Sequence, residues 1–293
     1  MLLATSVIWG TAFAVQSSAM DYVGPFTFNC IRIILAGVAL LPIVLFVRRR
    51  PLTKETIIGG LACGTCLCVA SAIQQVGLSM TTAGKAGFIT ALYIVIVPLL
   101  GMFAGRRVTG RIWGCVAIAT VGFFLLCADT DFSISEGDML CLICALFFSF
   151  HILTIDYFGR KNADGITMSC IQFFVAGILS AAPMFAIEAP AIGDILNAKG
   201  QIFYAGVMSG GVGYTLQILG QKRTDPASAT LVLSLESVFA ALSGWIMLKQ
   251  GLTIRELAGC ALVFAAVLLA QTPEKEADMN GIFEQNDEKS RPR

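Results

Sequence analysis

One carboxyl group interrupts the apolar run 224–248, and it is the residue of this chain best placed to do chemistry. Glu236 lies about 15 Å along a helix from Pro226, near the middle of a bilayer. A charge there costs about 2.5–3.5 kcal/mol on insertion scales. Because an apolar surrounding favours the neutral form, Glu236 could carry a coupling proton, or it could contact an amine. A structural carboxyl group that bonds to Ser234 or Ser237 is the alternative.

Three further ionisable residues lie inside apolar stretches. Arg32 lies about 10 Å along its helix from Pro25. It could bind a carboxylate or balance Glu236, although such arginines also extend to the interface or brace backbone carbonyls. His151 is the one histidine, and Asp156 lies one turn further along. A proton relay through this pair and a core histidine with satisfied hydrogen bonds are both open readings.

Uncharged amide and aromatic side chains could line a path beside these groups. Gln74 and Gln217 occupy corresponding positions in two similar stretches, and they could line a cavity or bond across helices. Large aromatic residues could form walls for an amphipathic solute, or they could simply pack. The expected cavity lining is Trp9, Phe13, Gln74, Tyr93, His151, Tyr214, Gln217 and Glu236, with Glu236, Arg32 and Asp156 as candidates for charge or proton coupling.

Other kinds of chemistry lack a full set of residues. Two C-x-x-C pairs, Cys63 with Cys66 and Cys141 with Cys144, could suggest a soft metal or a redox site. No loop histidine or cysteine completes a ligand set, and cysteine also serves as a small apolar residue between close helices. We therefore expect no metal, no cofactor and no catalytic residue.

Long apolar helices must hold these residues. The chain has 293 residues, of which 56% are hydrophobic and 13% are charged, whereas soluble domains carry about 25% charged residues. Its net charge of +1 gives no reason to expect a nucleic-acid partner. Because about 20 apolar residues cross a hydrocarbon core, we expect an all-α integral membrane protein with ten transmembrane helices. They are expected at 2–18, 27–47, 57–79, 83–104, 111–128, 138–158, 166–187, 201–221, 226–248 and 256–271.

Basic residues gather in every second loop, after the second, fourth, sixth and eighth predicted helices. Lys249 and Arg255 are the main exception. Since basic loops favour the cytoplasm, we expect both termini to be cytoplasmic. The first apolar stretch reads as a retained helix rather than a signal peptide. Residues 272–293 are polar and have no helical period, which predicts a disordered cytoplasmic tail.

The chain contains an internal repeat. A shift of 143 residues pairs Thr81 with Thr224 and Gly101 with Gly244, and shifts of 140 and 145 align flanking segments. The repeats are expected at 1–130 and 138–271, with five helices each. Because five crossings reverse direction, the second repeat must be inverted relative to the first. Inverted repeats are typical of secondary transporters with a site at the bilayer midplane, although duplication could also merely enlarge a bundle.

These patterns resemble the EamA-type ten-helix branch of the drug/metabolite transporter superfamily, over nearly the whole chain. The matching features are Trp9-Gly10 with Phe13, Pro25 followed by Arg32, Thr82-Ala83 through Ala91-Leu92 and Pro98, and the stretch SLESVFAALSGWIMLKQGLTIRELAG. The resemblance implies transport, often export, of small metabolites such as amino acids without ATP. The family often has Gly-Glu before a basic residue at the ends of the fourth and ninth helices. Here Gly105-Arg106 and Lys249-Gln250 stand there, so a coupling role for that glutamate does not carry over.

We therefore expect a multi-pass secondary transporter of the inner or plasma membrane, either an exporter or an exchanger. Its small-molecule substrate, and protons as a second candidate, would meet a central cavity exposed alternately to each side. The protein would be a monomer or a homodimer in the lipid bilayer. A non-transporting membrane protein or a membrane enzyme is the alternative. An enzyme should present a nucleophile with a base at a membrane face, and only His151 with Asp156 approaches this.

Overall fold

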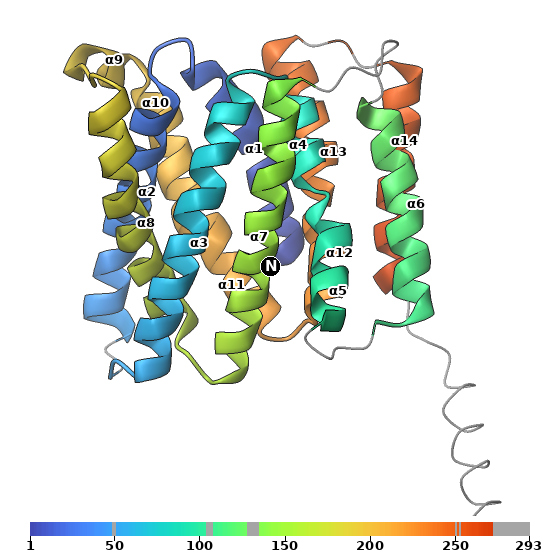
Figure 1. The fold of residues 1–293 in the computed structure, drawn as a ribbon, viewed down its shortest axis with the longest axis horizontal. Coiled ribbons are helices and arrows are strands. Elements are labelled where there is room, and N and C mark those ends of the chain that lie inside the picture. Colours follow the sequence, from blue (N-terminus) through green and yellow to red (C-terminus); the bar gives the residue numbers. More distant parts are fainter. Residues whose placement is uncertain (49–50, 104–107, 128–134, 250, 252, 272–293) are drawn as a thin grey trace, which may run out of the picture.

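The computed structural model describes residues 1–48, 51–103, 108–127, 135–249, 251 and 253–271. Within these ranges the chain forms helices and no strand (Figure 1). The elements are α1 Leu2–Ala19, α2 Pro25–Pro42, η1 Ile43–Arg48, α3 Lys54–Leu78, α4 Ala83–Thr90, α5 Tyr93–Phe103, α6 Gly110–Cys127, α7 Glu136–Arg160, α8 Gly165–Ile187, α9 Ile192–Asn197, α10 Lys199–Phe203, η2 Tyr204–Tyr214, α11 Thr215–Gln221, α12 Pro226–Leu233, α13 Leu235–Leu248 and α14 Ile254–Gln271.

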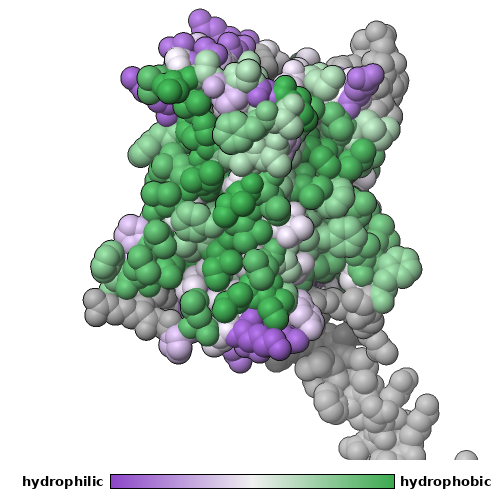
Figure 2. Space-filling model, turned by 60° about the vertical axis from the view of Figure 1, so that its left-hand side comes forward, coloured by the Kyte–Doolittle hydropathy of each residue, from purple (hydrophilic) through white to green (hydrophobic). Residues whose placement is uncertain are grey.

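The lengths and surfaces of these helices are those of a multi-pass membrane protein. In the described ranges, eight helical stretches are long and apolar enough to cross a membrane, and 110–125 and 257–270 are shorter apolar helices. Large apolar side chains such as Phe103, Phe185 and Ile246 point outward. Figure 2 shows apolar side chains over the flank of the molecule and hydrophilic ones gathered at its two ends.

Local sequence explains where several helices begin. Pro25 and Pro226 each occupy the first turn of a helix, where the missing N–H is not needed. The Asp225 carboxylate accepts a hydrogen bond from the Ser228 amide at 3.0 Å, which caps the start of α12. At the start of α7, Ser135 and Asp138 form a reciprocal capping box.

Two of the predicted helices are each divided in two. We predicted continuous helices at 83–104 and 226–248, but α4 ends before Ala91 and α12 ends before Ser234. Both breaks contain tight i to i+3 hydrogen bonds, including Ser237 N to Ser234 O at 3.1 Å. The Ser234 and Ser237 hydroxyls donate to backbone carbonyls three residues earlier, which competes with regular helix pairing. Ala91 and Ser234 lie 143 positions apart, the same shift as the internal repeat.

The helix predicted at 201–221 is wound differently at its centre. η2, Tyr204–Tyr214, is an eleven-residue π-helix, a rare form that often marks functional sites. Gly206 and Gly210 lie against α2: a Cβ on Gly210 would lie 2.6 Å from the Ala36 Cβ. This close approach explains why glycine is needed there.

The helices form one bundle in which α1 lies among elements from the far end of the sequence. α3 packs against α7 and α8, α2 packs against α8, and α6 pairs with α14 at one side of the bundle (Figure 1). α1 packs along α13 and η2. At Gly10 this contact is so close that a Cβ would lie 2.3 Å from the Phe239 Cβ. The interior between α1 and its late-sequence neighbours contains the candidate site.

Candidate functional site

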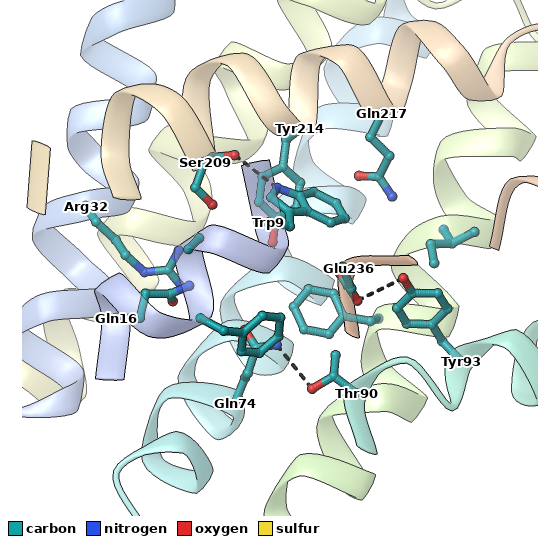
Figure 3. A pocket seen from close by; sticks show the side chains of 14 residues that line it. Trp9, Gln16, Arg32, Gln74, Thr90, Tyr93, Ser209, Tyr214, Gln217 and Glu236 are labelled. Atoms are coloured by element: carbon teal, nitrogen blue, oxygen red, sulfur yellow. Dashed lines mark hydrogen bonds between the residues drawn. The ribbon is translucent and has the colours of Figure 1, made fainter. Parts of the chain in front are cut away.

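A cavity in the middle of the bundle gathers polar and aromatic side chains from both halves of the sequence (Figure 3). It encloses about 450 Å³ of space not filled by atoms, counting space open to solvent. That space is divided among the side chains, so a metabolite would need some of them to move. The lining residues are Trp9, Ala12, Phe13, Gln16, Arg32, Gln74, Thr90, Tyr93, Phe148, Ile152, Ser209, Tyr214, Gln217 and Glu236.

Glu236 and Tyr93 are joined by a hydrogen bond in this cavity. The Tyr93 hydroxyl donates to Glu236 Oε1 at 2.8 Å, and both residues are 2% exposed. Tyr93 is the first residue of α5 and Glu236 lies in the first turn of α13. The two helix breaks therefore bring both side chains to the cavity. The partner of the carboxyl group is this tyrosine, since the hydroxyls of Ser234 and Ser237 donate to backbone carbonyls.

Arg32 lies in the cavity wall, and its side chain does not reach the surface of the bundle. Its side chain is buried, and its Nη2 donates to Asn29 Oδ1 at 2.8 Å. The guanidinium carbon lies 5.8 Å from the centroid of the Phe28 ring. Its Nε is buried without a hydrogen-bond partner among the described residues. Arg32 thus contacts a neutral amide and an aromatic ring, and its guanidinium retains donors for an acceptor in the cavity.

An aromatic and amide group completes the cavity wall. The Trp9 indole N–H donates to the Ser209 carbonyl oxygen at 3.1 Å, and its ring lies 4.6 Å from that of Tyr214. Gln74 Nε2 donates to Thr90 Oγ1 at 3.3 Å. Figure 3 shows Trp9, Tyr214 and Gln74 around the same space as Glu236. The predicted lining residue Phe13 also contacts this cavity.

His151 and Asp156 lie outside the cavity lining and apart from each other. His151 is fully buried behind Tyr214, with ring centroids 5.8 Å apart, and its Nε2 lies 3.0 Å from Gln172 Oε1. Asp156 pairs with Arg160 at 3.1 Å and lines a different cavity. Five residues of α-helix turn the chain by about 140° beyond a full turn, so the two side chains face different neighbours.

Several cavity residues were not anticipated. Gln16 is a polar residue within the apolar segment 2–18, and that was an available signal. Ser209 contributes its backbone carbonyl, which a residue type cannot indicate. The other unanticipated lining residues are Ala12, Thr90, Phe148 and Ile152.

Comparison with known proteins adds a family and a fold. A family model described as the EamA-like transporter family matches residues 1–128 and 135–272. An "uncharacterized transporter" of Archaeoglobus fulgidus is 32% identical over 280 residues, covering 92% of this chain and 83% of that protein. The threonine/homoserine exporter RhtA of Salmonella typhimurium is 27% identical over 203 residues, covering 67% of this chain and 66% of that protein. A crystal structure of an 18% identical protein shares the fold, with a TM-score of 0.71 over 92% of this chain and 95% of that chain.

Proposed function

Because the chain belongs to the EamA-like transporter family, we propose that it is a secondary transporter, an exporter or exchanger, of small metabolites such as amino acids. The family and the similar proteins are transporters, not enzymes. This agrees with the expectation of a transporter rather than a membrane enzyme. It also leaves the membrane-enzyme alternative without support.

The observation that carries this proposal is the buried polar cavity between the two halves of the chain. Its lining includes Gln74 and Gln217, which correspond in the internal repeat, and the bonded pair Tyr93 and Glu236, which also correspond. We propose ten crossings built as two inverted five-helix repeats, 1–130 and 138–271. Rocking of one repeat against the other would expose this cavity alternately to each side of the membrane.

The charges of the cavity favour a substrate that carries both an anionic and a cationic group. The Arg32 guanidinium suits a carboxylate, and the Glu236 carboxyl group suits an amine. The aromatic rings of Trp9 and Tyr214 add apolar contact for a side chain. The relative RhtA is named as a threonine/homoserine exporter, so threonine and homoserine are the first solutes to test.

We further propose that Glu236 couples transport to protons, because it is the acidic residue in the cavity lining. The protein would lie in the inner or plasma membrane, with both termini and the tail 272–293 in the cytoplasm. It would act as a monomer or a homodimer.

Transport by purified protein in liposomes tests this proposal. Liposomes loaded with an isotope-labelled panel that includes threonine and homoserine should release at least one solute faster than protein-free liposomes. Gln217→Trp should block that release by filling the cavity, whereas Ile178→Trp should not, because Ile178 is 68% exposed on the outer face. Release of no panel member above the protein-free rate would overturn the proposal.

A further inference from the structure

Two glutamine amides on α11 lie in the walls of two different cavities. Gln217 lines the central cavity, and Gln221 lines a cavity at the end of the bundle where α7 and α11 end. We call the second one the end vestibule. It encloses about 640 Å³, including open solvent, and its lining is Asp156, Gly159, Arg160, Gln221, Lys222, Arg223, Thr224 and Asp225. Residues four apart share one face of a helix, so the two amides are stacked along α11.

On the neighbouring helix α7, two residues four positions apart also line the two cavities. Ile152 lines the central cavity, and Asp156, four residues later, lines the end vestibule. Four residues of helix rise by about 6 Å. One helical turn therefore separates the two cavities on both α7 and α11, and these two helices are in contact.

The amides that bridge this turn lack hydrogen-bond partners. Gln221 is 3% exposed, and neither its Oε1 nor its Nε2 has a partner within the part of the chain that the structure describes. The Gln217 Oε1 is likewise unpartnered there. Buried polar atoms in proteins almost always have partners. Water or the polar groups of a passing solute can supply them here, because both amides border a cavity.

The opposite end of the bundle is apolar at the corresponding position. The repeat shift of 143 pairs Gln74 with Gln217, and it pairs Leu78 with Gln221. Leu78 is 2% exposed and packs in a cluster with Phe13 and Cys141. The end that corresponds to the polar turn on α11 is therefore filled by hydrocarbon on α3.

Close backbone contact and a hydrogen bond also seal the Leu78 end. A Cβ on Gly77 would lie 2.9 Å from the Gly137 carbonyl oxygen, and a Cβ on Gly137 would lie 2.8 Å from the Met80 Cβ. The Thr81 hydroxyl donates to Asp138 Oδ1 at 2.7 Å. By contrast, a Cβ on Gly159 beside the end vestibule would first meet Lys222 at 3.7 Å. The backbone is thus packed more closely at Gly77 and Gly137 than at Gly159.

We infer that polar solutes pass between the central cavity and the solvent at this end of the bundle through the end vestibule, over the amides of Gln217 and then Gln221, while Leu78 closes the opposite end. The route suits small solutes that carry both charges, because the vestibule presents the carboxylates of Asp156 and Asp225 beside the guanidinium groups of Arg160 and Arg223. This inference extends the proposed transport function, and the role of the route in transport depends on that function. The difference in access between the two ends is a property of the fold alone.

Cysteine labelling of purified, detergent-solubilised protein tests the route without any substrate. Gln221→Cys and Leu78→Cys occupy corresponding positions in the repeats, and peptide mass spectrometry separates each new thiol from the native ones. A small, charged methanethiosulfonate should label Gln221→Cys at least tenfold faster than Leu78→Cys. Equal rates, or faster labelling of Leu78→Cys, would overturn the inference. Monodisperse elution in size exclusion serves as the folding control for each variant.

A second pair of variants keeps the test decisive if Gln221→Cys does not fold. Gln217→Cys should be labelled by the same reagent, and adding Gln221→Leu should slow that labelling at least fivefold, since an apolar side chain then closes the turn. Adding Leu78→Gln to Gln217→Cys should not slow it. An equal labelling rate of Gln217→Cys with and without Gln221→Leu would contradict the route. A protein that moves no solute in liposomes yet shows this labelling pattern would overturn the proposed function and leave the route intact.

Discussion

A hydrogen bond between Tyr93 and Glu236 links the two halves of the chain inside the cavity. A carboxyl group that accepts one hydrogen bond from a tyrosine, in a cavity with an arginine in its wall, retains acceptor capacity for a solute or a proton. The corresponding position in the first half is the tyrosine itself, so only one copy of the repeat supplies a titratable acid. This asymmetry is the reason why we propose proton coupling at Glu236 and not at the corresponding position of the first half, and the proposal can be tested directly.

Glu236→Gln should abolish the response of transport to a pH gradient. The amide oxygen can still accept the Tyr93 hydrogen bond, so the local structure is retained while the ionisable group is lost. The measurement is solute flux in liposomes with and without an imposed pH gradient. Tyr93→Phe removes the hydrogen bond but leaves the carboxyl group, so it should keep the gradient response. An undiminished response in Glu236→Gln would remove this residue from the coupling mechanism.

Glu236 and Tyr93 correspond under the repeat shift of 143 residues, which puts them at similar depths in the bilayer, and the structure joins them by a hydrogen bond. Depth follows from counting residues along a helix, but rotation about the helix axis does not, so the hydrogen bond itself could not be predicted. The different facing of His151 and Asp156, by contrast, follows from their five-residue spacing on one helix. Ser209 could not be predicted for another reason. Its backbone carbonyl accepts the Trp9 hydrogen bond, and the residue type gives no signal for a backbone contact.

At the scale of elements, the carboxylate of the residue that follows α8 binds the start of α2. The Glu188 side chain accepts hydrogen bonds from the amides of Phe26 and Thr27 at 2.9 and 2.8 Å, and from the Thr27 hydroxyl at 2.6 Å. Pro25 leaves these amides as the first free donors of the helix. The contact holds the ends of two helices together across 161 residues of sequence.

Glu188→Ala should lower the stability of the folded protein by about 1–2 kcal/mol, because helix donors at the start of α2 lose their acceptor. The measurement is the apparent Tm in detergent. Asp194→Ala, an exposed acidic residue on the short helix α9, should leave the Tm nearly unchanged. Equal Tm values for the two variants would mean that this cap contributes nothing measurable.

Gly10→Ala should destabilise the protein by about 1–3 kcal/mol, the usual cost of overpacking. The new Cβ would lie 2.3 Å from the Phe239 Cβ and 2.7 Å from the Glu236 carbonyl oxygen, so α1 and α13 would have to separate. The matched control is Gly114→Ala in α6, where no described atom beyond the glycine's own turn of helix lies within 4 Å of the new Cβ. The control should be neutral or stabilising by up to about 1 kcal/mol. A Tm for Gly10→Ala at or above that of the control would contradict this packing.

Helix positions were predictable because apolar length and loop charges are read directly from the sequence. The breaks in 83–104 and 226–248 were not, because no proline or glycine stands at Ala91 or Ser234 to indicate them. The π-helix η2 places Gly206 and Gly210 against α2, and a tertiary contact of this kind cannot be read from local sequence. Local composition therefore predicted the elements, and packing decided their internal geometry.

For the whole molecule, the alternation of basic loops predicts that both termini lie in the cytoplasm. Green fluorescent protein fused after the last residue should fluoresce in a bacterial host, since it folds inside the cell. Alkaline phosphatase fused after Asp194 should be active, because that loop is predicted to lie outside, and the same enzyme fused after Lys161 should be inactive. The reverse pattern of activities would invert the predicted orientation.

The contact between α1 and α13 can form only late in the synthesis of the protein. Gly10 and Phe239 are in contact in the finished structure. The ribosome adds Phe239 to the chain 229 residues after Gly10, as 239 minus 10 gives. At about 5–20 residues per second, α1 waits roughly 11–46 s for its final neighbour. Throughout that interval Gln16 and the Trp9 indole N–H lack the cavity that later surrounds them. The first helix must therefore be sheltered by the insertion machinery, or by provisional neighbours, until synthesis is nearly complete.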